Sequence, residues 1–217
     1  MSLEVSIMNQ NPFIVKHPLI DHKMTILRDK NTHNNYFRTL VKEITQMIVF
    51  PATHHLKLEK KGIITPVSDM VGHQLANDIL VVPIMRAGLG MLDAFTEMIP
   101  TAKVGHIGFV RDEKTLKASS YLVKLPKIES TTEVFILDPM LATGGTLIQA
   151  IDLIKKKGAK LITYLGLVAV QEGIDKVLKS HPTTNIYLAS LDKQLNSKGY
   201  IVPGLGDAGD RLFGEEG

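Results

Sequence analysis

Hydrophobic residues along this chain follow two alternating patterns, one with helical spacing and one of short continuous runs. Between residues 32 and 50 apolar side chains recur every three or four positions, which predicts an amphipathic helix that ends or bends at Pro51. Short apolar runs predict strands over residues 79–83, 104–110, 134–137, 161–170 and 185–189. Periodic segments predict helices over residues 89–99, 145–157 and 174–180. This alternation predicts an α/β fold with a central, mostly parallel sheet flanked by helices.

Residues 112–126 break this rhythm. They are polar, carry several charges and have no helical period, so we expect a flexible arm or a hairpin there. Such a segment serves either as a lid over a site or as a plain surface insertion. No repeat, low-complexity tract or Ser/Gly linker divides the rest of the sequence, and we expect residues 1–217 to form a single domain.

Composition narrows the class of protein. Of the 217 residues, 44% are hydrophobic and 22% are charged, which is an ordinary globular balance. Without cysteine the chain has no disulfides or thiolate metal sites, and a cytoplasmic location is expected. The net charge of +3 is spread along the chain, which predicts no nucleic-acid partner. No apolar run approaches the roughly 20 residues of a membrane helix, and residues 1–4 do not start a signal peptide, so no membrane partner is expected.

The most informative stretch is residues 133–149, where a predicted strand, a turn with two glycines and a predicted helix follow one another. Ligands of open α/β sheets bind beyond the carboxyl ends of the strands. Gly144 and Gly145 let the backbone approach a ligand and expose consecutive N–H groups, and the helix adds its positive end. Thr143 and Thr146 add hydroxyl donors. We expect a phosphate monoester here, with Asp138 against the hydroxyls of the sugar attached to it.

Two other kinds of site have weaker support. An ATPase-type phosphate loop needs a Lys after its last Gly, and Thr146 stands at that place. His54 and His55 are adjacent and lack the spacing of zinc ligands on a helix, so we interpret the histidines as surface or packing residues.

Three segments of the sequence resemble one family of enzymes. Residues 138–146 resemble the loop that binds phosphoribosyl pyrophosphate (PRPP) in type I phosphoribosyltransferases, and their first eight residues are similar to the uracil phosphoribosyltransferase version. Residues 82–91 and 199–211 resemble that family's first active-site segment and its C-terminal base-binding segment. The resemblance runs from about residue 16 to residue 213 and is weakest over residues 54–73. Thr146 stands where the family has Ser, and Leu137 stands where many other phosphoribosyltransferases have a second acid.

The resemblance implies a type I phosphoribosyltransferase-like fold with a small base-binding hood over residues 191–217. It also implies the conversion of uracil and PRPP to UMP and diphosphate, with Mg²⁺ as cofactor. The PRPP-binding residues that it implies are Arg86, Arg111, Asp138, Pro139, Met140, Leu141, Ala142, Thr143, Gly144, Gly145, Thr146 and Asp207. The uracil-binding residues are Tyr200, Ile201, Gly206, Asp207 and Ala208. Asp138, Arg111 and Asp207 are implied to be catalytic, with Asp207 reaching the metal through PRPP-bound Mg²⁺.

The implied roles agree with the chemistry of the residues. Displacement at the anomeric carbon passes through an oxocarbenium-like transition state, so positioning and charge stabilisation suffice without a protein nucleophile. The planar fork of Arg86 or Arg111 suits diphosphate, although a surface ion pair is the alternative. Asp207 suits a metal-bound diphosphate, although an aspartate in such a segment also bonds its own turn. Main-chain groups that match uracil would reject cytosine by about 10⁴-fold, because cytosine leaves buried donors facing each other.

Three alternatives remain open at this point. One is a phosphoribosyltransferase for a purine or for orotate, which the position of the C-terminal segment disfavours. Another is an RNA-binding regulator on the same fold that senses uridine nucleotides, which a net charge of +3 supports weakly. The third is an α/β domain without activity. The family resemblance further implies a homodimer or higher assembly, and GTP as an allosteric activator in some relatives.

Overall fold

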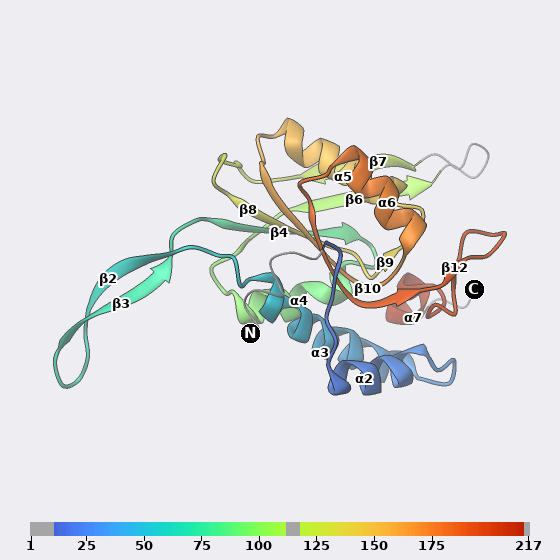
Figure 1. The fold of residues 1–217 in the computed structure, drawn as a ribbon, viewed down its shortest axis with the longest axis horizontal. Helices are drawn as coiled ribbons and strands as arrows, with labels where there is room; N and C mark the ends of the chain where they lie inside the picture. The colour runs from blue at the N-terminus through green and yellow to red at the C-terminus, as the bar shows by residue number, and fades with distance from the viewer. Residues whose placement is uncertain (1–10, 112–117, 215–217) are drawn as a thin grey trace.

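The computed structural model describes residues 11–111 and 118–214 and centres on one large sheet (Figure 1). Its strands lie in the order β1–β11–β10–β8–β4–β6–β7, with β5 beside β4 and β9 beside β10. Every pairing in this sheet is parallel except that of β6 with β7. The strands are β1 (Phe13–Ile14), β4 (Ile79–Met85), β5 (Lys103–Val104), β6 (His106–Arg111), β7 (Ala118–Lys124), β8 (Glu133–Leu137), β9 (Met140–Leu141), β10 (Leu161–Val170) and β11 (Asn185–Asp192). The expected α/β fold with a mostly parallel sheet is confirmed.

Helices cover both faces of the sheet, and the alternation of strand side chains explains why. Val81 and Phe135 pack in the core shared with α2 (Pro18–Arg28), α3 (Asn34–Ala52) and α4 (Leu89–Met98). Their sequence neighbours Val82 and Ile136 point to the opposite face and pack with α5 (Gly145–Lys156) and α6 (Gln171–Ser180). Both sets of side chains are removed from water, which accounts for the almost continuous apolar runs in the central strands.

Most of the predicted strands and helices are present, but α2 was not predicted and the bounds of two helices differ. The first long helix does not end before Pro51 but continues to Ala52, which is fully buried in the core. Burial of that apolar end offsets the one backbone hydrogen bond that a proline removes. Helix α6 begins at Gln171, directly after β10, rather than at residue 174.

A long hairpin projects from the body of the molecule and was not predicted (Figure 1). Its strands β2 (Leu58–Ile64) and β3 (Asp69–Leu75) pair in an antiparallel ladder that is separate from the main sheet. Nearly every residue of both strands is exposed, so no burial pattern marks them in the sequence. The hairpin coincides with the stretch where the family resemblance is weakest.

The segment expected as an arm or hairpin is partly described. Residues Ala118–Lys124 form β7, which pairs with β6, so this part is a hairpin strand at the sheet edge. Residues 112–117 lie outside the described ranges. At the other end of the chain, β12 (Gln194–Leu195) and β13 (Ile201–Val202) pair, and α7 (Ala208–Phe213) follows. None of the described helices is long and apolar enough to cross a membrane.

Candidate active site

The centre of the site is the connection between β8 and α5. Asp138 follows the last residue of β8, and Gly144 holds a left-handed backbone with φ of 76° immediately before α5. A Cβ on Gly144 would lie 2.7 Å from the carbonyl oxygen of Gly173, at the start of α6. Only glycine fits this close approach, which directs the first N–H groups of α5 toward the open end of the sheet. A glycine turn that leads directly into a helix is the geometry that anion sites at helix ends use.

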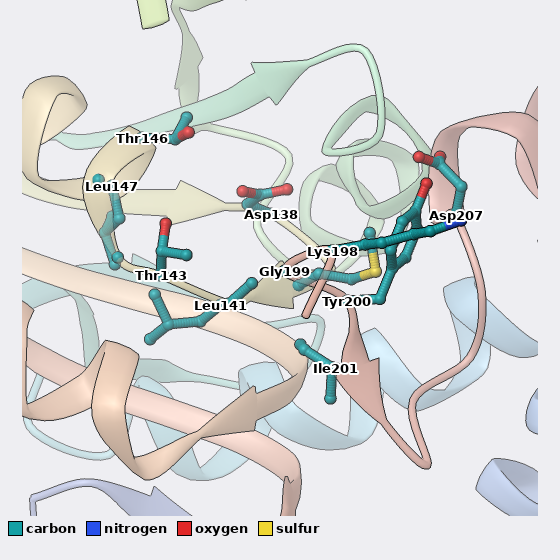
Figure 2. Close-up of a pocket in the computed structure, with 14 residues that line it drawn as sticks. Asp138, Leu141, Thr143, Thr146, Leu147, Lys198, Gly199, Tyr200, Ile201 and Asp207 are labelled. Atoms are coloured by element: carbon teal, nitrogen blue, oxygen red, sulfur yellow. The ribbon is translucent and has the colours of Figure 1, made fainter. Parts of the chain in front are cut away.

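A cleft of about 380 Å³ opens over this connection. Figure 2 shows Asp138 in its middle, with loop side chains on one side and the C-terminal segment on the other. The loop side consists of Asp138, Met140, Leu141, Ala142, Thr143, Gly144, Gly145, Thr146 and Leu147. The facing side consists of Lys198, Gly199, Tyr200, Ile201 and Asp207. Two segments about 60 residues apart in the sequence thus form one cleft at the carboxyl ends of the strands, as ligand sites in α/β sheets do.

A smaller pocket of about 200 Å³ adjoins the cleft and contains Arg86. Asp138 and Thr146 line both cavities, so Arg86 follows β4 close to the phosphate loop. Arg111 is the other arginine that the family resemblance implies for PRPP binding. It is the last residue of β6, and its side chain lies outside the described part of the structure.

Of the sequence-predicted residues whose side chains the structure describes, three line neither cavity. Pro139 is buried behind the loop, where its carbonyl oxygen accepts hydrogen bonds from the N–H groups of Leu167 (2.9 Å) and Val168 (3.0 Å). Ala208 is fully buried at the start of α7. Gly206 is exposed in a left-handed conformation with φ of 80°. Pro139 therefore supports the loop, Gly206 has only backbone atoms to offer a ligand, and Ala208 is fully covered by its surroundings.

Asp138 has an unusual electrostatic environment. Asp138 keeps some exposed surface, but the surrounding atoms remove most of the water from its carboxyl group. This desolvation raises the pKa of the carboxyl to about 8. The N–H of Met140 donates to the carboxylate and lowers the pKa, while the charge of Asp207 raises it further. The Tyr164 hydroxyl donates a 2.7 Å hydrogen bond to the main-chain carbonyl of Asp138 and fixes the strand end beneath the loop.

Asp207 both caps a helix and lines the cleft. Its Oδ1 atom caps α7 by accepting from the N–H groups of Gly209 (2.8 Å) and Asp210 (3.1 Å). The same residue lines the cleft opposite the phosphate loop. The turn aspartate is thus also a residue of the site, and the helix cap fixes where its carboxylate lies.

Lys198 is a residue of the cleft that sequence reasoning missed. It lies in the connection between β12 and β13, and its side chain extends along the C-terminal side of the cleft toward Asp207 (Figure 2). The sequence feature that could have indicated Lys198 is its position one residue before the base-binding segment at residues 199–211. Among the residues that line the main cleft it supplies the positive charge.

Comparison with known proteins decides which family carries this arrangement. The model of the family described as "Uracil phosphoribosyltransferase" matches residues 14–215. The chain belongs to the uracil phosphoribosyltransferase family. A uracil phosphoribosyltransferase of Fervidobacterium nodosum is 51% identical over 202 residues, which is 93% of this chain and 98% of the relative. One from Thermosipho melanesiensis is 53% identical over 92% of this chain and 97% of the relative.

Solved structures agree with a type I phosphoribosyltransferase fold. The AQ2163 protein from Aquifex aeolicus has a TM-score of 0.88 at 38% identity, covering 92% of this chain and 96% of that one. An adenine phosphoribosyltransferase from Trypanosoma brucei has a TM-score of 0.56 at 11% identity, covering 88% and 84%, which shows a shared type I fold alone. The expected fold family is confirmed.

Proposed function

We propose that this chain transfers the 5-phosphoribosyl group of PRPP to uracil, giving UMP and diphosphate. A bond forms between C1 of the ribose and N1 of the base, the bond from C1 to the diphosphate oxygen breaks, and the proton of N1 is released. The observation that carries the proposal is the single cleft between the phosphate loop and the segment at residues 198–207. Such a cleft places a sugar phosphate and a base side by side, which is the main requirement for this displacement.

The loop binds the 5-phosphate of PRPP in this proposal. The N–H groups at Gly144 and Gly145 lie at the positive end of α5, and Thr143 and Thr146 add hydroxyl donors. Asp138 accepts the ribose hydroxyls and stabilises positive charge on the ring in the transition state. Its raised pKa means that the free carboxyl holds a proton near neutral pH, and a cation bound beside it favours the charged form again.

The departing diphosphate requires positive charge, which Arg86, Arg111 and Mg²⁺ supply. Arg86 lines the pocket next to Asp138, where its planar fork suits two diphosphate oxygens. Among the described residues no three His, Asp or Glu side chains gather as a metal site. The fit for Mg²⁺ therefore depends on substrate oxygens together with the Asp207 carboxylate, a hard oxygen donor that faces the loop. Bound there, Mg²⁺ would neutralise charge on the diphosphate.

The C-terminal segment recognises uracil through its backbone. Ile201 and Asp207 line the cleft, and Gly206 and Ala208 are the two neighbours of Asp207 in the chain. Tyr200 is half exposed at the cleft wall, where its ring can pack against the base. Main-chain donors and acceptors that match O4, N3–H and O2 of uracil reject cytosine, since its 4-amino group is a donor in place of the O4 acceptor and its N3 is an acceptor in place of the N3–H donor.

Assembly and regulation belong to the same proposal. The β2–β3 hairpin exposes Ile64, Val67 and Val71 by 84%, 93% and 60%, which supports a homodimer or higher assembly that covers them. GTP activation rests on the family resemblance alone, and a cytoplasmic location on the cysteine-free composition.

Conversion of labelled uracil tests the proposal. With PRPP and Mg²⁺ present we expect UMP and diphosphate in equal amounts, and with EDTA in place of Mg²⁺ we expect the rate to fall strongly. An unchanged rate in EDTA would remove Mg²⁺ from the proposal. If PRPP binds but uracil is not converted, transfer to uracil is wrong, and salt-dependent binding of RNA would then favour the regulatory alternative.

A further inference from the structure

An arginine from the start of the chain contacts the base-binding segment at its end. Arg28 is the last residue of α2, and its guanidinium makes a bidentate pair with Asp192, the last residue of β11. The Nη2–Oδ1 and Nη1–Oδ2 distances are 2.6 and 2.7 Å. The Ser190 hydroxyl joins the pair by accepting from Arg28 (2.9 Å) and donating to Asp192 (3.1 Å). This fork-to-fork geometry fixes the orientation of both partners.

The same pair holds both backbone groups of Gly204. Arg28 Nη1 donates to the Gly204 carbonyl at 2.6 Å, and the Gly204 N–H donates to Asp192 Oδ2 at 2.8 Å. Gly204 is left-handed with φ of 66°, and a Cβ there would lie 2.2 Å from the Ile201 carbonyl oxygen. The ion pair therefore determines the path of the backbone between Ile201 and Gly206, the two residues that flank this turn in the proposed uracil site.

A second arginine, Arg211, links Leu205 to the same end of α2. Arg211 Nη1 donates to the carbonyl oxygens of Leu205 and Leu27, both at 2.8 Å, and Nη2 donates to that of Asp29 at 2.6 Å. Its guanidinium lies 4.3 Å above the ring of Phe37. The end of α2 is thus bound to residues 204 and 205, and Leu205 packs in the same core cluster as α2.

Burial makes the Arg28–Asp192 pair more than a surface ion pair. The side chains are 21% and 3% exposed. Desolvation alone would raise the pKa of Asp192, but hydrogen bonds from Arg28 and Gly204 and the charge of Arg28 lower it below its ordinary value. Removing one partner from such a pair leaves a buried charge or a buried donor without compensation.

We infer that Arg28 and Asp192 are positioning residues for the base: they set the backbone of residues 201–206, and through it the affinity and selectivity for uracil. The inference rests on the proposed function. Neither side chain lines the cleft or the phosphate loop, so the pair acts on base binding and leaves PRPP binding alone.

The test measures KM for uracil and for PRPP, kcat, and PRPP affinity by calorimetry, in Arg28→Lys and Asp192→Asn. Both variants keep a hydrogen-bonding group but lose the bidentate pair. We expect KM for uracil to rise roughly 10- to 100-fold, as for a displacement of about 1 Å in a site, and PRPP affinity to change less than twofold. Discrimination against cytosine should fall in parallel. A merely structural role would lower the active fraction and kcat without moving KM for uracil.

Two further variants complete the test. Lys23→Met is the matched control, because it removes an ion pair of the same helix, with Glu43 at 2.6 Å, that does not touch the base segment. Ser190→Ala keeps the ion pair and should raise KM for uracil about threefold, so it carries the test if the first two variants do not fold. An active wild type with unchanged KM for uracil in the folded variants overturns the inference. A wild type that forms no UMP refutes the proposed function instead.

Discussion

Replacement of Asp138 by Asn should raise the stability of this protein at neutral pH and lower its activity. The carboxyl has a folded pKa of about 8 against an ordinary value of 3.8. Between these values the unfolded chain releases a proton that the folded chain retains, so the folded state loses stability as pH rises. The loss amounts to about 1.4 kcal/mol per pH unit. Over the interval from 3.8 to 7 this gives a ceiling of about 4 kcal/mol, which partial access of solvent to the carboxyl reduces.

An asparagine has the same shape, accepts the N–H of Met140 and carries no charge, so Asp138→Asn removes this pH-dependent term. The variant should therefore gain stability over the wild type as pH rises from 5 to 8. For a domain of this size each kcal/mol corresponds to about 2–4 °C in Tm, and we expect a relative gain of at least about 5 °C across that range. Turnover of uracil should fall by roughly 10²-fold or more, because the variant cannot stabilise positive charge on the ribose.

The assay is thermal unfolding of the ligand-free protein by circular dichroism at pH 5, 6, 7 and 8. Asp78→Asn is the control, since Asp78 is an exposed residue that pairs with Lys103 at 2.6 Å. Its Tm should follow that of the wild type at every pH. Parallel Tm curves for Asp138→Asn and the wild type would refute the electrostatic reasoning, and turnover near the wild-type value would refute the catalytic role.

Three further predictions concern the PRPP half of the site. Arg86→Ala and Arg111→Ala should weaken PRPP binding about 10-fold or more and leave uracil binding almost unchanged; calorimetry that finds full PRPP affinity would count against both roles. Tyr164→Phe removes the hydroxyl that holds the carbonyl at the strand end, and kcat/KM for PRPP should fall about 5-fold with the fold retained; identical kinetics would show that the bond is dispensable. Gly144→Ala should abolish PRPP binding, because its Cβ would meet the Gly173 carbonyl at 2.7 Å, and a variant that binds normally would disprove the tight loop.

The parts of the fold that sequence predicted are those with local signals. The connection from β8 to α5 combines a buried strand, two glycines and a helix that ends before Gly158, and each signal lies within a few residues of the next. The β2–β3 hairpin was not predicted because its side chains face solvent on both sides. A strand without a buried face has no reason to alternate apolar and polar residues.

The site itself was predictable only in part, for a similar reason. The resemblance supplied the loop and the C-terminal segment, and the structure brings both to one cleft. The contact of Arg28 with Asp192 joins residues 164 positions apart, and no spacing in the sequence marks such a pair. The pKa of Asp138 likewise depends on packing from several elements, so it follows from the fold and not from the motif.

The most direct test of the central claim is a base panel with the wild-type protein. PRPP and Mg²⁺ are supplied with uracil, cytosine, orotate, hypoxanthine or adenine in turn, and nucleotide formation is followed by chromatography. The account predicts UMP from uracil and rates at least about 10⁴-fold lower with cytosine. Efficient conversion of a different base would contradict the assignment of the C-terminal segment to uracil, and no conversion of any base would contradict the proposed transfer.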